Sequence, residues 1–472
     1  MNATRNALLS MMRDILFDPH LRAKWSCRSV SRLLLLLCMT VGFVESASAL
    51  PSYARQTGYA CIKCHVGGFG PQLTPYGVRF KLAAYTETDH KGLKIPVAAF
   101  IYGGFTHTEK DQPTPPTPHT AVNDNTTLDQ ISGFIAGRWF EDMGSFVQVT
   151  YNGNTKGLST DNTDIRYAHD FVIGHTDALV GVTVNNNPTI QDPFNTLFAW
   201  NFPYLSSAVA FGQGSTGTQI SGGLGPAVLG ESLYTFINDS ILAEVGTYHA
   251  WSPAMQVKLG LGAGNDIGRI GDSVYWRLAY LQDMNTQAFS VGLVGFNVSR
   301  QPERIPGGPI DRYRDIGADA WYEFLGNGRH NIAAYASYVR EDQNLGDMVA
   351  NAVAAGGPVP NPNERLYDLR LNASYYYDQT YGVTIGRFSR RGTSDPVLYA
   401  PTGSPDTTGT IFQVDYTPFG KADSWGRPFA NVRVGLQYTL YDKYNGASTN
   451  YDGTGRNAGD NNTLYLFVWL AM

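Results

Sequence analysis

The chain is dominated by short segments in which apolar and polar residues alternate. From Ile95 to Met472 these segments are separated by turns rich in Gly, Asn, Asp and Pro. Residues 369–375 and 432–440 alternate with a period of two, the pattern of a β-strand with one apolar and one polar face. Arg370 and Arg433 lie within these segments. A strand that lines a wet lumen tolerates such charges, so the pattern indicates a membrane β-barrel.

Turn signals divide this region into sixteen to eighteen candidate strands. Residues 141–144 and 326–328, for example, are typical hairpin turns. Residues 95–472 provide about 24 residues for each of sixteen strands with its turn, which suits strands of about 10 residues. Long polar stretches at 109–127, 343–364 and 443–462 are expected to be extracellular loops. We predict an all-β fold, an outer-membrane barrel of about sixteen antiparallel strands. A large soluble β-sandwich or repeat protein is the alternative.

The composition agrees with a barrel and excludes other classes. Only 16% of the residues are charged, 12% are aromatic and the mean hydropathy is −0.21. Alternating lipid-facing and lumen-facing residues produce such a near-neutral average. The formal net charge of −5 offers no basic surface for nucleic acid. A hydrophobic content of 43% argues against disorder, and 4 cysteines are too few for a disulfide scaffold.

Residues 1–49 are predicted to be a secretory signal peptide. Basic residues between positions 22 and 32 precede an apolar run from Leu33 to Val44, and small residues follow up to Ala49. This order is typical of export signals, and an apolar run of about 12 residues is too short for a spanning helix. An uncleaved anchor is the alternative. Cleavage after Ala49 leaves Cys61 and Cys64 as the cysteines of the mature chain.

These two cysteines form, with His65, a C-x-x-C-H motif, the covalent attachment motif of c-type haem. Each thiol adds to one haem vinyl group, and the adjacent imidazole binds the iron. We therefore predict a haem c-binding segment at 50–94, before a barrel at 95–472, with Cys61 and Cys64 as the attachment residues and His65 as the proximal iron ligand. The alternatives are a disulfide redox pair, a zinc site or chance. No thioredoxin-like pattern follows, and no further zinc ligands lie close in sequence.

The sequence leaves the second axial ligand open. No Met or His occurs between Val66 and Asp89. The candidates are residues farther along the chain, or no residue at all: His90, His107, Met143, His169 and His175. Each also fits an ordinary loop or lumen side chain. Three residues after the motif are candidate partners for haem propionates, or else form a solvated helix face: Tyr76, Arg79 and Lys81.

The stretch 185–204 does not fit the strand pattern. It contains three prolines, which break a β-ladder, together with amides, aromatic residues and Asp192. It either folds inward, as a constriction or a cover for a haem edge, or forms an ordinary loop. The sequence slightly favours the ordinary loop.

Several segments carry a family resemblance. Tyr53–Gly58 precede the C-x-x-C-H motif, Leu73–Gly77 and Phe80–Leu82 follow it, and Asn-Asn-Pro-Thr, Gln-Asp, Ala-Trp and Pro-Tyr occur within 186–204. With the signal peptide and the barrel, these segments resemble the fused monohaem cytochrome–porins of the bacterial outer membrane, whose best-known members are iron-oxidising cytochromes. The resemblance implies one covalent haem c, extracellular Fe(II) as electron donor and a periplasmic cytochrome c as acceptor. The activity it implies is that of an iron:cytochrome c reductase.

Three other functions remain open. They are a redox conduit for another donor or acceptor, a porin in which the haem segment is a plug, and a haem enzyme with an open iron site. No dedicated iron-binding cluster is visible in the sequence. The acidic residues of 161–164 and 341–342 are expected in solvated loops.

Overall fold

A computed structural model describes residues 50–92, 94–214, 216–262, 266–326, 328–426 and 428–472. The predicted signal peptide, residues 1–49, lies outside the described residues. None of the helices in the described ranges is both long and apolar enough to cross a membrane.

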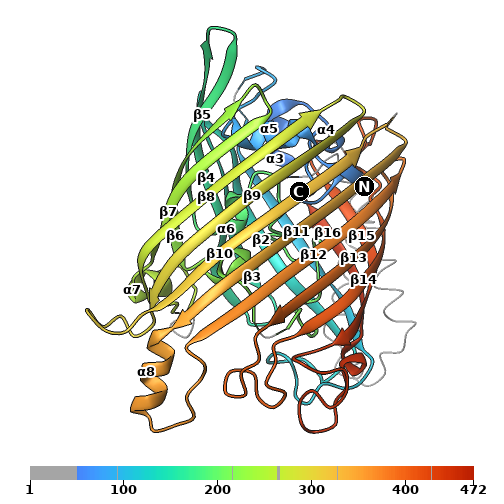
Figure 1. Cartoon of the computed structure of the whole chain (residues 1–472). Coiled ribbons are helices and arrows are strands. Elements are labelled where there is room, and N and C mark those ends of the chain that lie inside the picture. The colour runs from blue at the N-terminus through green and yellow to red at the C-terminus, as the bar shows by residue number, and fades with distance from the viewer. Residues whose placement is uncertain (1–49, 93, 215, 263–265, 327, 427) are drawn as a thin grey trace. The chain divides into compact units, whose positions relative to one another are not determined.

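The described residues of the barrel form sixteen strands (Figure 1). In chain order they are β1 (Val97–Thr108), β2 (Asn125–Phe140), β3 (Met143–Asn152), β4 (Gly157–Ile173), β5 (Thr176–Asn185), β6 (Val228–Ile237), β7 (Ile241–Ala250), β8 (Arg269–Asp283), β9 (Gln287–Gln301), β10 (Asp311–Phe324), β11 (His330–Leu345), β12 (Asn363–Tyr377), β13 (Tyr381–Gly392), β14 (Thr407–Tyr416), β15 (Asn431–Lys443) and β16 (Thr463–Ala471).

The sheet is closed, because β1 pairs with both β2 and β16. Phe100 of β1 lies opposite Ser132 on one side and Ala471 on the other, and both pairings are antiparallel. A closed sheet has no unpaired edge, which is the condition for a β-structure to cross the hydrocarbon core of a bilayer. The predicted sixteen-stranded barrel is confirmed, and the soluble alternative is wrong.

Lumen-facing and outward-facing residues alternate along the strands. On β12, Asp368, Arg370 and Asn372 are buried toward the lumen, whereas Leu371 and Tyr375 are 41% and 40% exposed on the outside. Large apolar side chains are exposed in the same way on strands throughout the barrel. An apolar surface of this extent is stable against lipid rather than water. The protein is therefore an outer-membrane barrel, as predicted.

The acidic residues expected in solvated loops lie on strands instead. Asp164 on β4 and Glu341 on β11 are both fully buried. The alternation of the strands turns these side chains inward, where other parts of the chain exclude water.

The two ends of the barrel differ. At one end, β2–β3, β4–β5, β6–β7 and β8–β9 are joined by turns of at most three residues. At the other end the connections are long and include α7 (Pro253–Lys258) and α8 (Gly346–Ala354), at the bottom of Figure 1. Outer-membrane barrels have short periplasmic turns and long extracellular loops. The short-turn end is therefore the periplasmic end, and the three predicted extracellular loops lie at the opposite one.

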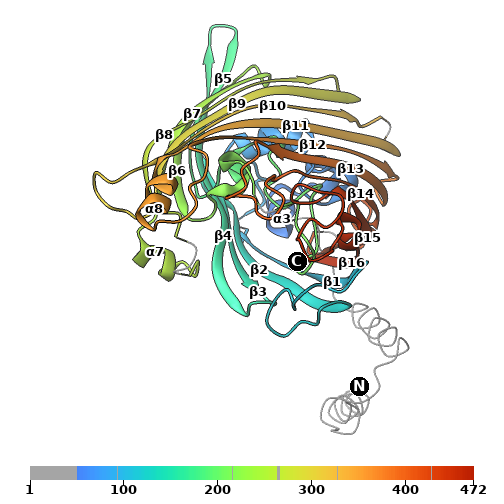
Figure 2. The same cartoon turned by 60° about the horizontal axis from the view of Figure 1, so that its bottom comes forward.

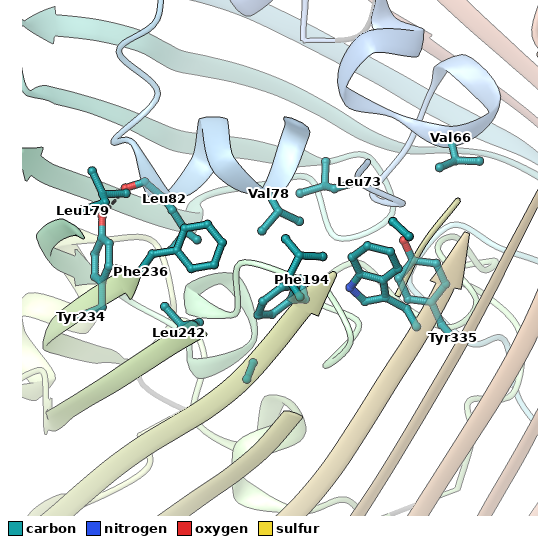
Figure 3. Close-up of a cluster of buried hydrophobic side chains, with 14 of the residues drawn as sticks. Val66, Leu73, Val78, Leu82, Leu179, Phe194, Tyr234, Phe236, Leu242 and Tyr335 are labelled. Atoms are coloured by element: carbon teal, nitrogen blue, oxygen red, sulfur yellow. Dashed lines mark hydrogen bonds between the residues drawn. The ribbon is translucent and has the colours of Figure 1, made fainter. Parts of the chain in front are cut away.

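The segment before β1 is helical and lies within the ring of strands (Figure 2). It contains α3 (Pro51–Thr57), α4 (Cys61–Cys64), the short helix η3 (Val66–Gly68) and α5 (Pro75–Leu82). Val66, Leu73, Val78 and Leu82 pack in one buried cluster with Tyr335 of β11 and other strand residues (Figure 3). Burial of each such side chain contributes roughly 1.5–3 kcal/mol, which holds the segment inside the lumen.

Candidate functional site

The C-x-x-C-H motif lies on a single helical turn inside the barrel. Cys61 and Cys64 begin and end α4, and residues three apart lie on the same side of a helix. His65 caps the turn with extended backbone, and its N–H donates a hydrogen bond of 2.7 Å to the Cys61 carbonyl. The two thiols are not joined in a disulfide. The fold thus brings two thiols and one imidazole together.

The start of α5 holds α4 in place. The Thr74 hydroxyl accepts a hydrogen bond from the Gly77 N–H at 3.2 Å and donates one to the Lys63 carbonyl at 2.7 Å. The Thr74 N–H donates to the Cys64 carbonyl at 3.0 Å. A Cβ atom at Gly77 would lie 2.4 Å from that carbonyl oxygen. Only glycine permits this close approach of the two helices.

The motif forms part of the wall of a largely apolar cavity. Cys61, Cys64 and His65 line it, and its empty volume is about 1020 Å³, which includes its open mouth. Most of the remaining wall is apolar or aromatic: Leu50, Tyr53, Phe69, Leu73, Phe80, Tyr85, Phe100, Phe146, Ile190, Trp200 and Trp469. A wall of this character suits a large, mostly apolar cofactor.

Burial sets the protonation states of the motif. It lowers the pKa of His65 to about 4; the Gly70 backbone raises this pKa and the Arg433 charge lowers it further. The imidazole is therefore neutral at pH 7, the form that ligates a metal. Its buried Nδ1 atom makes no hydrogen bond to the described residues. Burial also raises the pKa of Cys64 to about 12, an effect that the neighbouring Cys61 increases.

The donor set fits a c-type haem. Two thiols and an adjacent neutral imidazole on an apolar wall match two vinyl attachments and one axial nitrogen. A zinc site fits poorly, because no group of three or more His, Cys, Asp and Glu side chains in the described ranges could hold a metal ion.

None of the predicted second axial ligands reaches the cavity. The described residues that line it include no Met and no His other than His65. His107 pairs with Asp124 at 2.7 Å, and His169 pairs with Asp142 at 2.8 Å. The other three candidates also lie outside the lining: His90, Met143 and His175. The cavity wall thus supplies one imidazole.

Lys81 connects α5 to the stretch 186–204. Its side chain is buried, and Nζ donates to the carbonyls of Ile190 and Asp192 at 2.7 and 2.8 Å and to Asn195 Oδ1 at 3.2 Å. Burial lowers the pKa of Lys81 to about 8, a neighbouring arginine lowers it further, and nearby carboxylates oppose the shift. The solvated-face interpretation is therefore wrong for Lys81, whose three donors already have acceptors.

The other two candidate propionate partners do not line the cavity. Arg79 forms ion pairs with Asp170 at 2.7 Å and Asp239 at 2.8 Å. The Tyr76 ring lies below the Lys63 ammonium, 4.4 Å from the ring centre. Arg79 therefore contacts the short-turn end of the barrel, and Tyr76 contacts the helical segment itself.

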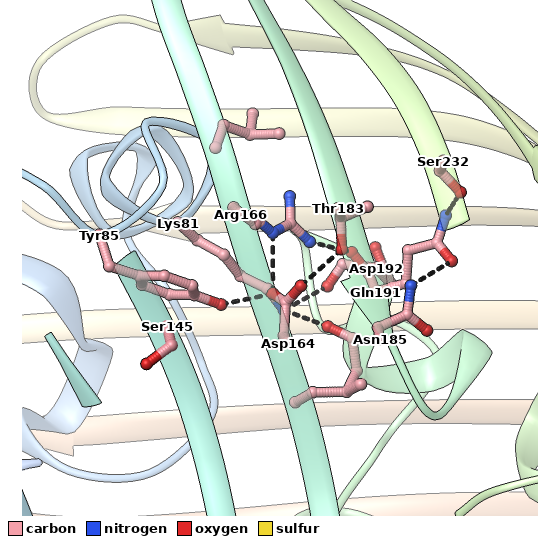
Figure 4. Close-up of polar contacts among 12 residues, drawn as sticks. Lys81, Tyr85, Ser145, Asp164, Arg166, Thr183, Asn185, Gln191, Asp192 and Ser232 are labelled. Carbon is pink, nitrogen blue, oxygen red and sulfur yellow. Dashed lines mark hydrogen bonds and ion pairs between the residues drawn. The ribbon is translucent and has the colours of Figure 1, made fainter. Parts of the chain in front are cut away.

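The stretch 186–204 folds into the lumen, so its interpretation as an ordinary loop is wrong. It contains the short helix α6 (Pro188–Gln191), and both Gln191 and Asp192 are fully buried. The Asp192 carboxylate accepts three backbone N–H hydrogen bonds within the stretch and lies 3.4 Å from Arg277. Arg166 of β4 donates to the Gln191 carbonyl at 2.6 Å (Figure 4). Buried polar contacts thus fix the stretch to the barrel wall.

Neighbouring residues of this stretch face two different cavities. Ile190 and Trp200 line the apolar cavity, whereas Thr189 and Ala199 line a second one. We call the second cavity the polar chamber; its empty volume is about 1110 Å³, open solvent included. The stretch is therefore a partition one backbone segment thick between the two cavities.

Sequence reasoning missed the barrel residues that hold the motif. Asn431 at the start of β15 donates from Nδ2 to the Gly68 carbonyl at 2.8 Å, and the same atom lies 3.6 Å from Cys61 Sγ. Arg433 donates to the Phe69 carbonyl at 2.8 Å. The polar-face position of Arg433 was the one available signal. It indicated a lumen-facing side chain without indicating its partner.

No protein-family model matches the chain, and no curated protein matches it. Solved structures to which the chain is similar include the following three, each at low identity. The outer membrane channel DcaP of Acinetobacter baumannii is 11% identical, with a TM-score of 0.44, over 81% of this chain and 99% of that one. OmpF of Salmonella typhi is 14% identical, with a TM-score of 0.42, over 81% and 98%. An anion-selective porin from Comamonas acidovorans is 13% identical, with a TM-score of 0.40, over 80% and 98%. The barrel assignment rests on this chain's own strand pairing.

Proposed function

We propose that the protein is a c-type cytochrome within a porin-type outer-membrane barrel, which takes electrons from extracellular Fe(II) and passes them to a periplasmic cytochrome c. Cys61 and Cys64 hold one haem covalently, and His65 is its proximal ligand. The observation that carries the proposal is the C-x-x-C-H motif on the wall of an apolar cavity inside the lumen. The haem, when bound, supplies the one-electron chemistry.

The residues of the chain bind and shield the redox centre. The thiols of α4 fix it covalently, and the neutral imidazole of His65 is available as a ligand without loss of a proton. Aromatic side chains from β1, β3 and β16, such as Phe100, Phe146 and Trp469, give the cavity an apolar wall. A dry site of low dielectric is one means by which a protein sets a haem potential.

The position of the motif supports transfer toward the periplasm. On α5, Arg79 pairs with Asp170 near the end of β4 and with Asp239 in the β6–β7 turn. The helical segment is thus tied to the short-turn, periplasmic end, where a soluble cytochrome can approach. The polar chamber lies on the other side of the partition, toward the long loops.

A porin that passes solutes is less well supported. The helical segment and the stretch 186–204 pack against strands across the lumen, and Phe194, Val78 and Tyr335 belong to one buried cluster. A packed lumen blocks hydrated solutes, whereas electrons need no aqueous path. A conduit for another donor keeps the same architecture, so the choice of Fe(II) rests on the family resemblance.

The proposal is tested with oxidised protein purified in detergent from a host that matures c-type cytochromes. We expect haem staining of the band on a denaturing gel, and rapid appearance of reduced-haem absorption when Fe(II) is added anaerobically. The Cys61→Ser/Cys64→Ser double variant should lose the staining, and a His90→Ala variant should keep it. Absence of covalent haem in the wild type overturns the cytochrome assignment. Haem that dithionite reduces but Fe(II) does not overturns the assignment of Fe(II) as donor.

A further inference from the structure

The polar chamber differs from the apolar cavity in position and lining. Its wall includes Thr463, the first residue of β16, and Arg390, near the end of β13, so it lies toward the long-loop end of the barrel. Amides and hydroxyls form much of the rest: Asn187, Asn201, Ser206, Ser207, Gln437 and Thr439. The chamber's empty volume of about 1110 Å³ includes open solvent, and its polar lining suits a small hydrophilic molecule.

The chamber carries positive charge. Arg370 and Arg390 are the charged residues among the described residues that line it, and none of those residues is acidic. Both guanidinium groups contact the carboxylate of Asp368, at 2.8 Å and 3.1 Å respectively. One carboxylate neutralises only one of the two arginines, so the group of Arg370, Arg390 and Asp368 carries one net positive charge.

Arg370 retains hydrogen-bonding capacity. Its Nε and Nη2 atoms donate to Asp368 at 3.1 and 2.8 Å, and Nη1 makes no hydrogen bond to the described residues. The guanidinium lies over the ring of Phe198, 5.9 Å from the ring centre, and the side chain is nine-tenths buried. A buried guanidinium with an available donor favours a carboxylate ligand, because the hydrogen bond is charge-assisted.

The chamber adjoins the apolar cavity across the partition. Ala199 and Trp200 are consecutive, yet the first lines the chamber and the second lines the cavity. Thr189 and Ile190 divide in the same way. A molecule in the chamber is thus separated from the cavity by one backbone segment.

We propose that the polar chamber binds small carboxylate-bearing anions. On the basis of the proposed function, the ligand is an anionic carboxylate chelate of Fe(II), which donates its electron across the partition. The chelated Fe(II) would lose one electron and become Fe(III), and the haem that Cys61, Cys64 and His65 would hold would supply the one-electron acceptor. No bond is formed or broken, no proton moves, and the ferric chelate leaves by the long-loop end.

Three probes and three variants test this inference in the haem-loaded protein. Binding of Zn(II)–EDTA, an anionic chelate without redox chemistry, is measured by titration calorimetry. Haem reduction by Fe(II)–EDTA and by aqueous Fe(II) is followed by stopped-flow absorption. Arg370→Gln removes the available donor. Ser206→Asp adds a negative charge to the chamber, and the Ser206 hydroxyl makes no hydrogen bond to the part of the chain that the structure describes. Arg340→Gln, at an exposed pair with Asp342 outside the chamber, is the matched control.

We expect Arg370→Gln and Ser206→Asp each to weaken Zn(II)–EDTA binding about tenfold or more, since a charge-assisted hydrogen bond or a like charge is worth at least that factor. Both should slow reduction by Fe(II)–EDTA, Ser206→Asp should not slow reduction by aqueous Fe(II), and Arg340→Gln should behave as wild type. No binding of Zn(II)–EDTA to the wild type, or equal binding by all four proteins, overturns the inference and leaves the proposed function intact. Binding that depends on Arg370 without haem reduction by either Fe(II) species upholds the anion site and overturns Fe(II) as donor.

Discussion

At the scale of single residues, the chemistry of the cavity depends on His65. Its ring lines an apolar space, burial keeps it neutral at pH 7, and no other imidazole of the described lining competes with it. Its position depends in turn on Gly77, where the backbone of α5 touches the backbone of α4. One glycine therefore controls where the imidazole lies.

The histidines and the methionine outside the cavity should not affect the haem. We expect five variants to keep the wild-type ferric and ferrous spectra: His90→Ala, His107→Ala, Met143→Leu, His169→Ala and His175→Ala. None of the five native side chains lines the cavity. A substitution changes the spin state of a haem when it removes an axial ligand, so these substitutions should leave the spin state unchanged. Visible absorption and electron paramagnetic resonance provide the measurement. A changed spin state in any of the five would identify that residue as an axial ligand.

Gly77→Ala should disturb the motif. The added Cβ would lie 2.4 Å from the Cys64 carbonyl oxygen, so α4 must move. We expect a stability loss of about 1–3 kcal/mol, as in other overpacked sites, and a lower yield of covalent haem per barrel. Urea unfolding and haem staining measure both. Gly133→Ala on β2, where the added Cβ meets open space, is the control and should lie within about 0.5 kcal/mol of wild type.

At the scale of elements, α5 and the stretch 186–204 form one unit. Lys81 satisfies two backbone carbonyls of the stretch, and Asn195 returns a hydrogen bond to the Pro71 carbonyl at 2.8 Å. The strands hold the stretch through Arg166 and Arg277, and Asp164 accepts a hydrogen bond from Tyr85, which follows α5. Neither piece has a stable position without the other.

Loss of the Lys81 ammonium should loosen this unit. Lys81→Met keeps an unbranched apolar side chain but leaves the Ile190 and Asp192 carbonyls without their donor. We expect the variant to lose about 3 kcal/mol of stability, because buried acceptors are left unpaired. Urea-induced unfolding in detergent measures the change, and Lys91→Met at an exposed position is the control. Equal losses in the two variants would show that the buried contacts of Lys81 contribute nothing specific.

The partition should be closed to ions. Asp192 holds the stretch through three backbone N–H groups and Arg277, so we expect negligible conductance from the wild-type protein in planar bilayers. Asp192→Ala leaves a buried arginine with one partner fewer, costs about 3–5 kcal/mol and should produce frequent open events. Stable porin-sized steps from the wild type would contradict the packed lumen and favour the porin function.

At the scale of the whole molecule, the lumen of the barrel has an apolar part and a polar part, and the outer surface is apolar. The exterior is apolar where it meets lipid, the periplasmic part of the lumen is apolar around the motif, and the extracellular part is polar. One closed sheet therefore surrounds both the polar chamber and the apolar cavity.

A charge on the exterior should destabilise the barrel in lipid. Leu293 in the middle of β9 is 52% exposed on the outer face. Leu293→Arg should cost about 2–4 kcal/mol if it lies near the bilayer midplane, whereas Leu293→Met should cost less than about 1.5 kcal/mol. Urea titration of folding into lipid vesicles gives both values. Equal stability of the two variants would place this face in water.

The predictions from sequence succeeded where the physical signal was local. The period of two identified the strands around Leu371 and Val434, because a strand with lipid on one side and a lumen on the other must alternate. Turn signals predicted sixteen to eighteen strands, and the structure has sixteen among the described residues. The predictions failed for Asp164, which was expected in a solvated loop. For Lys81 and the stretch 186–204 they left two interpretations open, and the structure excludes the solvated helix face and the slightly favoured ordinary loop. Their burial follows from a packed lumen, and no local pattern distinguishes a wet lumen from a filled one.

The sequence by itself determined the barrel, its polar and apolar faces and the C-x-x-C-H motif, since these follow from residue type and short spacing. The tertiary structure alone decided that the motif lines an apolar cavity, that the predicted second ligands lie elsewhere, and that one loop divides the lumen. These features depend on contacts between residues up to several hundred positions apart, such as Gly68 with Asn431. Barrel closure brings such residues together. The spacing of residues along the chain does not predict these long-range contacts.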